Sequence, residues 1–138
     1  MRRTLAVLAV TTLALTACAG GAGDSVGPGS LAGTYSLQTV NGKSPPVVII
    51  EDAGYKLEVL SGTYTLNVDD SYSATASFRE TEDGVVTPSS ESETGHYSVH
   101  GSSVTFTDSD GFEIDATISG STLTLVADGL TARYSRQP

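Results

Sequence analysis

Apolar and polar residues alternate with a period of two along most of the chain after residue 30. Strict alternation is typical of β-strands with one buried and one solvated face, because successive side chains point to opposite faces. Beyond the first 17 residues no stretch shows a sustained helical period. The pattern predicts about nine strands, and its clearest runs have as their apolar members Tyr55, Leu57, Val59; Tyr64, Leu66, Val68; Tyr72, Ala74, Ala76, Phe78; and Phe112, Ile114, Ala116, Ile118.

Short turn-forming pairs separate these runs, so sequential strands are expected to pair as antiparallel hairpins. The sequence therefore predicts an all-β fold, an antiparallel up-and-down meander of about eight to ten strands. Closure of the meander into a barrel is favoured because a closed sheet has no exposed edges. The turn pairs are Asn41-Gly42, Asp69-Asp70, Gly101-Ser102, Asp110-Gly111, Gly120-Ser121 and Asp128-Gly129.

Three segments depart from the alternation. Residues 47–50 are continuously apolar, which indicates either a strand buried on both faces or a segment that covers one end of the barrel. Gly62 interrupts a run and predicts a bend or a turn. Residues 80–94 are polar and carry five acids, and we expect them to form a long mobile hairpin tip.

The first 17 residues have the organisation of an export signal. Arg2 and Arg3 precede an apolar stretch over residues 5–15, and small residues follow it. The stretch is short for a membrane-spanning helix, which needs about 20 residues. Leu15-Thr16-Ala17-Cys18 resembles the lipobox of bacterial lipoproteins, and Cys18 is the only cysteine.

The lipobox resemblance implies that residues 1–17 are removed and that Cys18 is lipidated. Several acyl chains on one residue give a stable membrane attachment. An ordinary secretory leader with a free thiol and an uncleaved membrane anchor are the alternatives. Ala19 is not the aspartate associated with inner-membrane retention, so the expected location is the outer membrane, facing the periplasm.

The chain then divides into three parts: the leader at 1–17, a Gly-rich linker at 18–30 that begins with the lipidated Cys18, and one globular domain at 31–138. The formal net charge of −9 becomes more negative once the leader arginines are removed. Such a charge disfavours nucleic acid as a partner. The possible partners are then the membrane, which the protein reaches through its lipid anchor, and a basic protein.

The start of the domain carries a second resemblance. Residues 31–37 (Leu-Ala-Gly-Thr-Tyr-Ser-Leu) and Val40-Asn41-Gly42-Lys43 resemble the opening of bacterial lipocalin-like lipoproteins, with Tyr35 in the place of the Trp of Gly-x-Trp. Residues 120–125 and 132–134 resemble the closing strands of that group. The resemblance implies an up-and-down barrel with an apolar ligand inside, and Arg133 or Arg136 packed against the first strand.

Six tyrosines fall on the apolar phase of their strands, and several alanines there are small enough to leave room inside a barrel. One interpretation is an aromatic-walled cavity for a small amphipathic ligand. The other is plain core filling, with each hydroxyl reaching water or backbone. The candidate cavity-lining residues are Tyr35, Tyr64, Tyr72, Phe78, Tyr97, Phe106 and Tyr134.

Sequence signals for catalysis or metal binding are lacking. His96 and His100 lie about 13 Å apart if they share a strand, too far to bind one zinc ion. No Gly-x-Ser-x-Gly elbow occurs, and the acidic turn at residues 108–113 lacks the later ligands of an EF-hand. We therefore expect no enzyme, no cofactor and no metal.

Two functions from different classes remain. The first is a membrane-anchored envelope protein that binds a small apolar or amphipathic ligand. The second is a non-enzymatic interaction or inhibitor module that meets a basic protein partner through Glu80, Glu82, Glu91 and Glu93.

Overall fold

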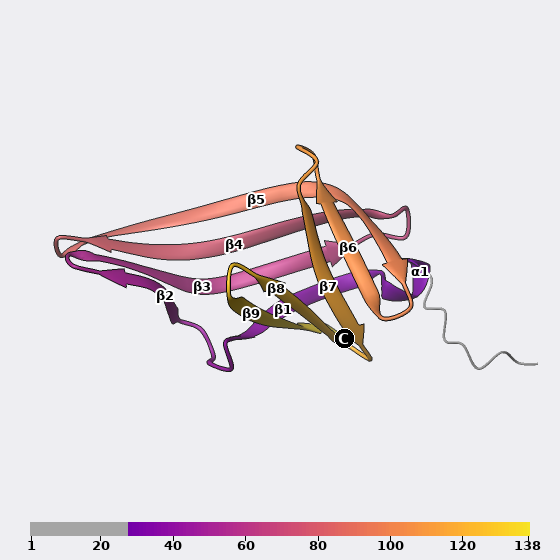
Figure 1. Ribbon diagram of the computed structural model, residues 1–138, viewed down its shortest axis with the longest axis horizontal. Coiled ribbons are helices and arrows are strands. Elements are labelled where there is room, and N and C mark those ends of the chain that lie inside the picture. Colours follow the sequence, from indigo (N-terminus) through magenta and orange to yellow (C-terminus); the bar gives the residue numbers. More distant parts are fainter. Residues whose placement is uncertain (1–27) are drawn as a thin grey trace, which may run out of the picture.

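The computed structural model describes residues 28–138, so the predictions for the leader, for Cys18 and for residues 19–27 lie outside the described residues. A single helical turn, α1 (Pro28–Leu31), leads into an all-β domain (Figure 1). Its strands are β1 (Gly33–Val40), β2 (Val47–Asp52), β3 (Tyr55–Leu66), β4 (Ser71–Glu82), β5 (Val85–His100), β6 (Ser103–Asp108), β7 (Glu113–Ser119), β8 (Thr122–Ala127) and β9 (Leu130–Arg136).

The strands form one antiparallel sheet that closes on itself. Its order is β1-β9-β8-β7-β6-β5-β4-β3-β2, and β1 also pairs with β3. Tyr35 on β1 is opposite Arg136 of β9 and Tyr64 of β3, so β1 joins the two ends of an eight-stranded barrel. β2 pairs with β3 outside the closed circuit. The predicted antiparallel meander that closes into a barrel is confirmed.

Tight turns set the register of several hairpins. In Asn41-Gly42 both residues have positive φ, 49° and 79°, and Val40 and Lys43 exchange two backbone hydrogen bonds across the turn. Asp83-Gly84 and Asp128-Gly129 have the same pair of positive φ angles. This geometry is that of type I′ turns, whose twist matches that of paired strands.

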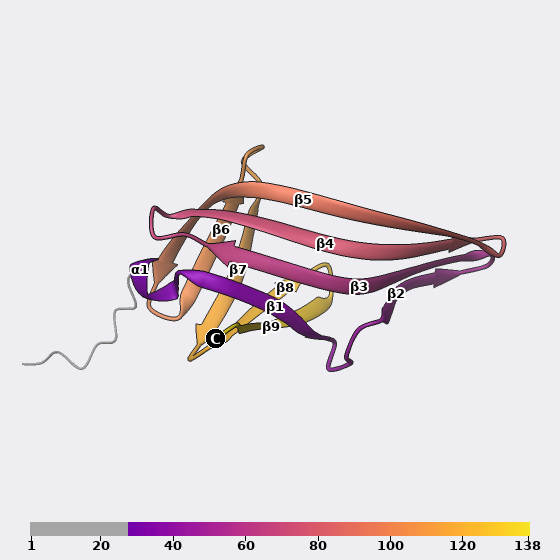
Figure 2. The same cartoon turned by 180° about the vertical axis from the view of Figure 1, so that it is seen from behind.

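Strands β3, β4 and β5 are longer than the barrel that they help to form. β3 pairs with β2 through its first half and with β1 through its second half. Together with β2, residues 55–59, 78–82 and 85–89 form an extension that we call the projecting sheet. It runs out to one side of the barrel in both views (Figures 1 and 2).

The expectation of a mobile tip at residues 80–94 is wrong. These residues complete β4 and begin β5, and only Asp83 and Gly84 form the turn. Pairing between the two strands satisfies the backbone groups, and both faces here are largely in contact with solvent. Alternation between apolar and polar residues was therefore not needed for strand formation.

Three smaller expectations also need correction. Residues 47–50 belong to an edge strand of the projecting sheet, with Val48 and Ile50 43% and 48% exposed. β3 runs through Gly62 without a turn, and the bulge lies just before it, between Val59 and Ser61. Phe112 lies outside β7 in the preceding loop and is 76% exposed.

The barrel interior is filled at its centre. Side chains from most strands form one buried cluster, and its members with almost no exposure are Tyr35, Phe106, Leu66, Leu123 and Val104. At the α1 end the Tyr35 hydroxyl donates a hydrogen bond to the Leu31 carbonyl, at 2.9 Å. Arg136 donates hydrogen bonds to the carbonyls of Ser30 and Ala32 there, whereas Arg133 lies opposite Thr39, near the other end of β1. Of the two arginines, Arg136 is the one that packs at the first strand.

Replacing Leu123 by Asp should prevent folding, because it places an unpaired charge in the barrel core. We expect a loss of roughly 4 kcal/mol or more, comparable with the whole free energy of unfolding of a domain, about 5–15 kcal/mol. Thr122→Asp, which changes the neighbouring residue on the outer face, should cost about 1 kcal/mol or less. Urea unfolding followed by circular dichroism measures both, and similar midpoints for the two variants would contradict the described strand phase.

Candidate functional site

The inner face of the projecting sheet continues the inner face of the barrel. Phe78 has the same phase along β4 as Tyr72, Ala74 and Ala76, whose side chains point into the barrel. Residues opposite one another on paired strands share a face. The register therefore places on this face a group of apolar side chains, which we call the platform: Val47, Ile50, Tyr55, Leu57, Val59 and Phe78.

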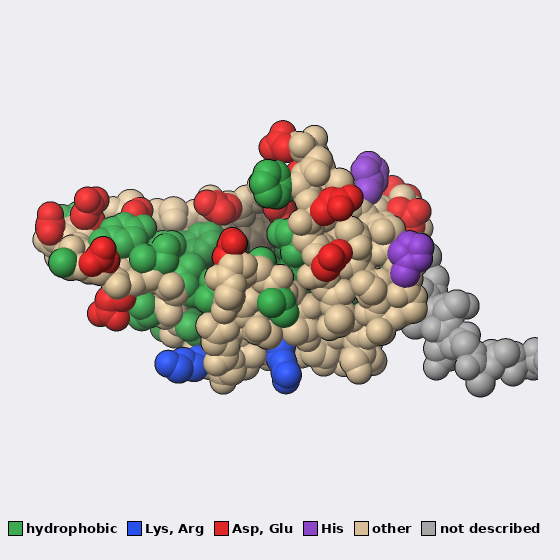
Figure 3. All heavy atoms as spheres, viewed as in Figure 1, with side chains coloured by type: hydrophobic (Ala, Val, Ile, Leu, Met, Phe, Trp, Pro, Cys, Tyr) green, Lys and Arg blue, Asp and Glu red, His purple; other side chains and the backbone are tan. Residues whose placement is uncertain are grey.

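The platform is partly open to solvent on the side viewed in Figure 3: Ile50 is 48% exposed and Tyr55, Leu57 and Phe78 are half-buried, whereas Val47 and Val59 are buried. A continuous apolar surface covers the projecting sheet there, acidic side chains surround it, and the surface is hollowed where the sheet meets the barrel. β6 pairs with β5 only from Gly95 onward, so residues 85–94 have β4 as their one strand partner. β6 approaches closely at this point, since a Cβ on Gly95 would collide with the Thr107 carbonyl oxygen.

A pocket of about 200 Å³ lies at this junction, and we call it the mouth pocket. Its inner wall is aromatic, its sides carry small apolar groups, and two carboxylates lie on β5. The lining residues are Tyr64, Ala74, Thr75, Ala76, Glu91, Ser92, Glu93, Ile114 and Tyr134. Ala76 is two residues from Phe78, so the pocket leads directly onto the platform.

Glu93 is the polar centre of the mouth pocket. The Tyr72 hydroxyl donates a hydrogen bond to its Oε1 at 3.3 Å, and the Tyr64 hydroxyl lies near this carboxylate. Burial, followed by the nearby charge of Glu93, raises the pKa of Tyr72 and, to about 12, that of Tyr134. Burial likewise raises the pKa of Tyr64. All three hydroxyls are therefore protonated at neutral pH, and that of Tyr72 donates to Glu93.

The aromatic wall is held by ring contacts. Tyr64 meets Tyr134 edge to face, with centroids 5.2 Å apart, and packs on Phe106 at 5.0 Å. Tyr72 contacts the same Phe106 at 4.9 Å. Aromatic pairs at these centroid distances stabilise the fold by more than the burial of their apolar area alone would. Gly62 allows the Tyr134 ring to approach β3, because a Cβ there would lie 3.1 Å from its hydroxyl oxygen.

The seven residues expected to line a cavity occupy different places. Tyr64 and Tyr134 line the mouth pocket, and Tyr72 reaches it through Glu93. Phe78 lies outside, on the platform. The remaining three, Tyr35, Tyr97 and Phe106, fill the barrel core. There the Tyr97 hydroxyl donates a hydrogen bond to the Asn67 carbonyl at 2.7 Å.

The pocket acids were not predicted from the sequence, because Glu91 and Glu93 were expected to lie in a mobile hairpin tip. The signal was present in the phase of β5. Counting back from the buried Tyr97 in steps of two gives Gly95, Glu93 and Glu91 on the inner face. The expectation that Ala74 and Ala76 point inward agrees with their positions in the pocket wall.

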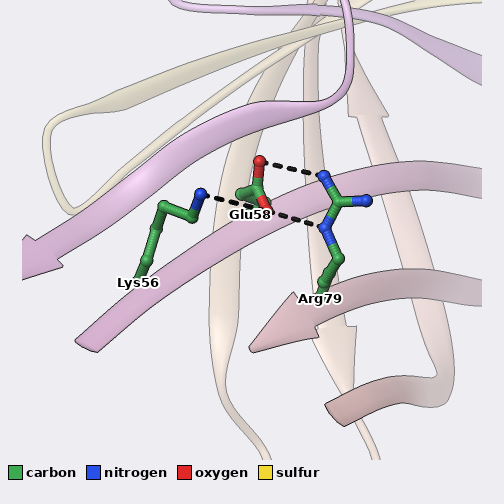
Figure 4. Close-up of polar contacts among 3 residues, drawn as sticks. All are labelled: Lys56, Glu58 and Arg79. Atoms are coloured by element: carbon green, nitrogen blue, oxygen red, sulfur yellow. Dashed lines mark hydrogen bonds and ion pairs between the residues drawn. The ribbon is translucent and has the colours of Figure 1, made fainter. Parts of the chain in front are cut away.

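The opposite, outer face of the projecting sheet carries an ion-pair cluster (Figure 4). Arg79 donates hydrogen bonds to both carboxylate oxygens of Glu58, at 2.7 and 3.1 Å. The Lys56 ammonium lies 3.9 Å from Oε2 of the same carboxylate. The Glu58 side chain is only 9% exposed. The hydrogen bonds from Arg79 lower the pKa of Glu58. The two basic side chains of the projecting sheet are thus held away from the platform.

Residues 28–138 contain neither a metal centre nor a membrane-spanning helix. Within them no group of three or more His, Cys, Asp or Glu side chains is placed to hold a metal ion. No helix in the same range has the length and apolar character to cross a membrane.

The closed eight-stranded meander with a small pocket at its mouth is an up-and-down barrel of the kind that can enclose a small ligand. The lipocalin-like domain family matches residues 31–126, and the chain belongs to this family. Such domains are in general not enzymes. Comparisons with curated proteins and with solved structures give no match.

The Glu58–Arg79 pair predicts a specific acid dependence of stability. A carboxylate with a lowered pKa contributes stability that is complete above its unfolded value, about 4.3. That stability is lost as the pH falls through the folded value. Arg79→Met should therefore lower the urea midpoint at about pH 6, and its difference from wild type should shrink towards about pH 3. Arg133→Met is the matched control, and a difference that stays constant with pH in Arg79→Met would contradict the assignment.

Proposed function

We propose that this protein is a non-enzymatic binder of a small apolar or amphipathic molecule, held at the mouth pocket and along the platform. The observation that carries the proposal is the continuity of a partly exposed apolar sheet face with a pocket that enters the barrel. A contiguous exposed apolar surface with a polar rim is typical of an interaction site. The family membership supports a binding role.

The size of the mouth pocket limits how the ligand is held. Its volume of about 200 Å³ is below the range of about 300–1,000 Å³ typical of small-molecule pockets. It corresponds to roughly six or seven water molecules. Because aromatic rings fill the barrel behind it, only part of a larger ligand can enter. The rest would lie on the platform, against Phe78, Leu57 and Val59.

We also propose that the protein acts at a bacterial membrane, as a lipoprotein anchored through Cys18. Support comes from the leader, in which a basic start, an apolar stretch and the lipobox-like Leu15-Thr16-Ala17 precede the one cysteine of the chain. In a Gram-negative host the expected site is the outer membrane, facing the periplasm. Residues 19–30 would separate the lipid from the barrel.

A second candidate function is recognition of a basic protein. The observation in its favour is the free edge of β5 at residues 85–94, which has no strand on one side within the described part of the chain and bears Glu91 and Glu93. An extended basic segment could pair along this edge, as in β-strand addition.

The binding proposal predicts that a neutral environment-sensitive probe, N-phenyl-1-naphthylamine, binds the purified protein with enhanced fluorescence. Ala76→Phe should fill the mouth pocket and weaken binding at least about tenfold, and Phe78→Ala should weaken it by removing platform area, at about 25 cal/mol per Å². Ser77→Phe adds the same ring to the outer face and should bind as wild type does. Loss of binding in Ser77→Phe alone, or no binding by wild type, would overturn the proposal.

Capture of a basic protein that depends on Glu91 would favour the second candidate.

The anchoring proposal predicts that the wild-type protein fractionates with membranes and carries acyl chains detectable by mass spectrometry. Cys18→Ser should remove the modification and leave the leader attached, as should treatment with globomycin. Normal processing of Cys18→Ser, with wild-type protein recovered in the soluble fraction, would show that the leader is of the ordinary secretory type.

A further inference from the structure

We propose that the mouth pocket selects a ligand with a cationic nitrogen, whose charged head meets Glu93 and Glu91 while its apolar tail lies along the platform. This inference rests on the proposed binding function and adds the chemical class of the ligand: a protonated or quaternary amine on an apolar body.

The first argument is the separation of charge between the two faces of the projecting sheet. The inner face carries acids and no base, whereas Lys56 and Arg79 both lie on the outer face. Figure 3 shows acidic side chains around the apolar surface, with basic side chains visible only along the lower edge of this view. By register, the acids of the inner face are Asp52, Glu80, Glu82, Glu91 and Glu93.

The second argument is the state of the pocket carboxylates. Within residues 28–138 the ion pairs are those of Glu58, so neither Glu91 nor Glu93 has a basic partner there. Glu93 accepts a hydrogen bond from Tyr72. A carboxylate offers about four lone-pair positions, so Glu93 keeps capacity for a charged donor. Hydrogen bonds with a charged partner are about twice as strong as neutral ones.

The third argument is the aromatic wall. The rings of Tyr64 and Tyr134 line the same small pocket as the carboxylates. A cation within about 6 Å of a ring centroid is attracted to the ring face, and more strongly where water is excluded. The combination of an aromatic wall with an acidic side favours an ammonium group over a neutral or anionic head.

The platform supplies the place for the tail. Along β4 the inner face runs from Ala76 at the pocket, past Phe78, to Glu80, roughly 13 Å at about 3.3 Å per residue. Interaction with Glu80 raises the pKa of Tyr55, and this polar pair lies at the far end of the platform. An apolar tail of moderate length therefore fits between two acidic ends, whereas the carboxylate of a fatty acid would be repelled at either one.

Three eight-carbon compounds with different heads test this inference on the purified protein: octylamine, octanol and octanoate, each titrated calorimetrically well below micelle formation. We expect octylamine to bind about tenfold more tightly than octanol, the size of one charge-assisted hydrogen bond, and octanoate to bind most weakly. Equal binding of octylamine and octanol would overturn the cation preference and leave the binding proposal intact. Failure of all three to bind would count against both.

Isosteric neutral variants locate the effect. Glu93→Gln should bring octylamine binding to the level of octanol, and octanol binding should stay unchanged. Glu91→Gln should reduce the octylamine preference in part, and it serves as the second variant if Glu93→Gln folds poorly. Glu51→Gln makes the same charge change on the outer face of the projecting sheet and should leave the preference intact. A preference that survives in both pocket variants, or that falls equally in Glu51→Gln, would overturn the inference, because the general negative charge would then explain it.

Discussion

The backbone pairing of β4 with β5 along their whole length is the constraint on which the rest of the structure depends. The ladder runs without a register shift from Ser71 opposite His96 to Glu82 opposite Val85. Only the part near the first pair is needed to close the barrel. Because a regular ladder keeps each face in phase, the inner face of the barrel continues past its rim. The platform and the mouth pocket both follow from that excess length.

The filled interior and the projecting sheet complement each other. Tyr64, Tyr72, Tyr134 and Phe106 occupy the space that a ligand would use in a more open barrel. One of these tyrosines, Tyr72, donates its hydroxyl to Glu93 at the rim, where burial without such a partner would be costly. The proposed ligand site therefore lies at the mouth of the barrel and not at its centre. The outer face of the projecting sheet is held meanwhile by the Glu58 cluster and by pairing with β2.

The sequence predicted the fold well where one face is buried and the other is solvated. The phase of Tyr72, Tyr97 and Leu123 gave the inward residues correctly, because the barrel core imposes a period of two. The pattern failed at residues 80–94, where neither face is deeply buried and pairing alone determines the conformation. It also misplaced Phe112, since the alternation cannot show where a strand begins. The pocket acids Glu91 and Glu93 were missed because neither face is deeply buried at residues 80–94. Their spacing from Tyr97 in steps of two nevertheless indicates that they lie on the inner face.

The position of the chain entry bears on how a ligand reaches the site. α1 lies at one end of the molecule and the turn between β4 and β5 at the other, as both ribbon views show (Figures 1 and 2). With the proposed attachment at Cys18, the tether would enter the barrel at its α1 end, at the opposite end of the molecule from the outer part of the platform. The platform would then be accessible to molecules of the aqueous compartment. Dissolved amphiphiles with a cationic head would also be concentrated there, since the acidic inner face attracts them and repels the anionic ones.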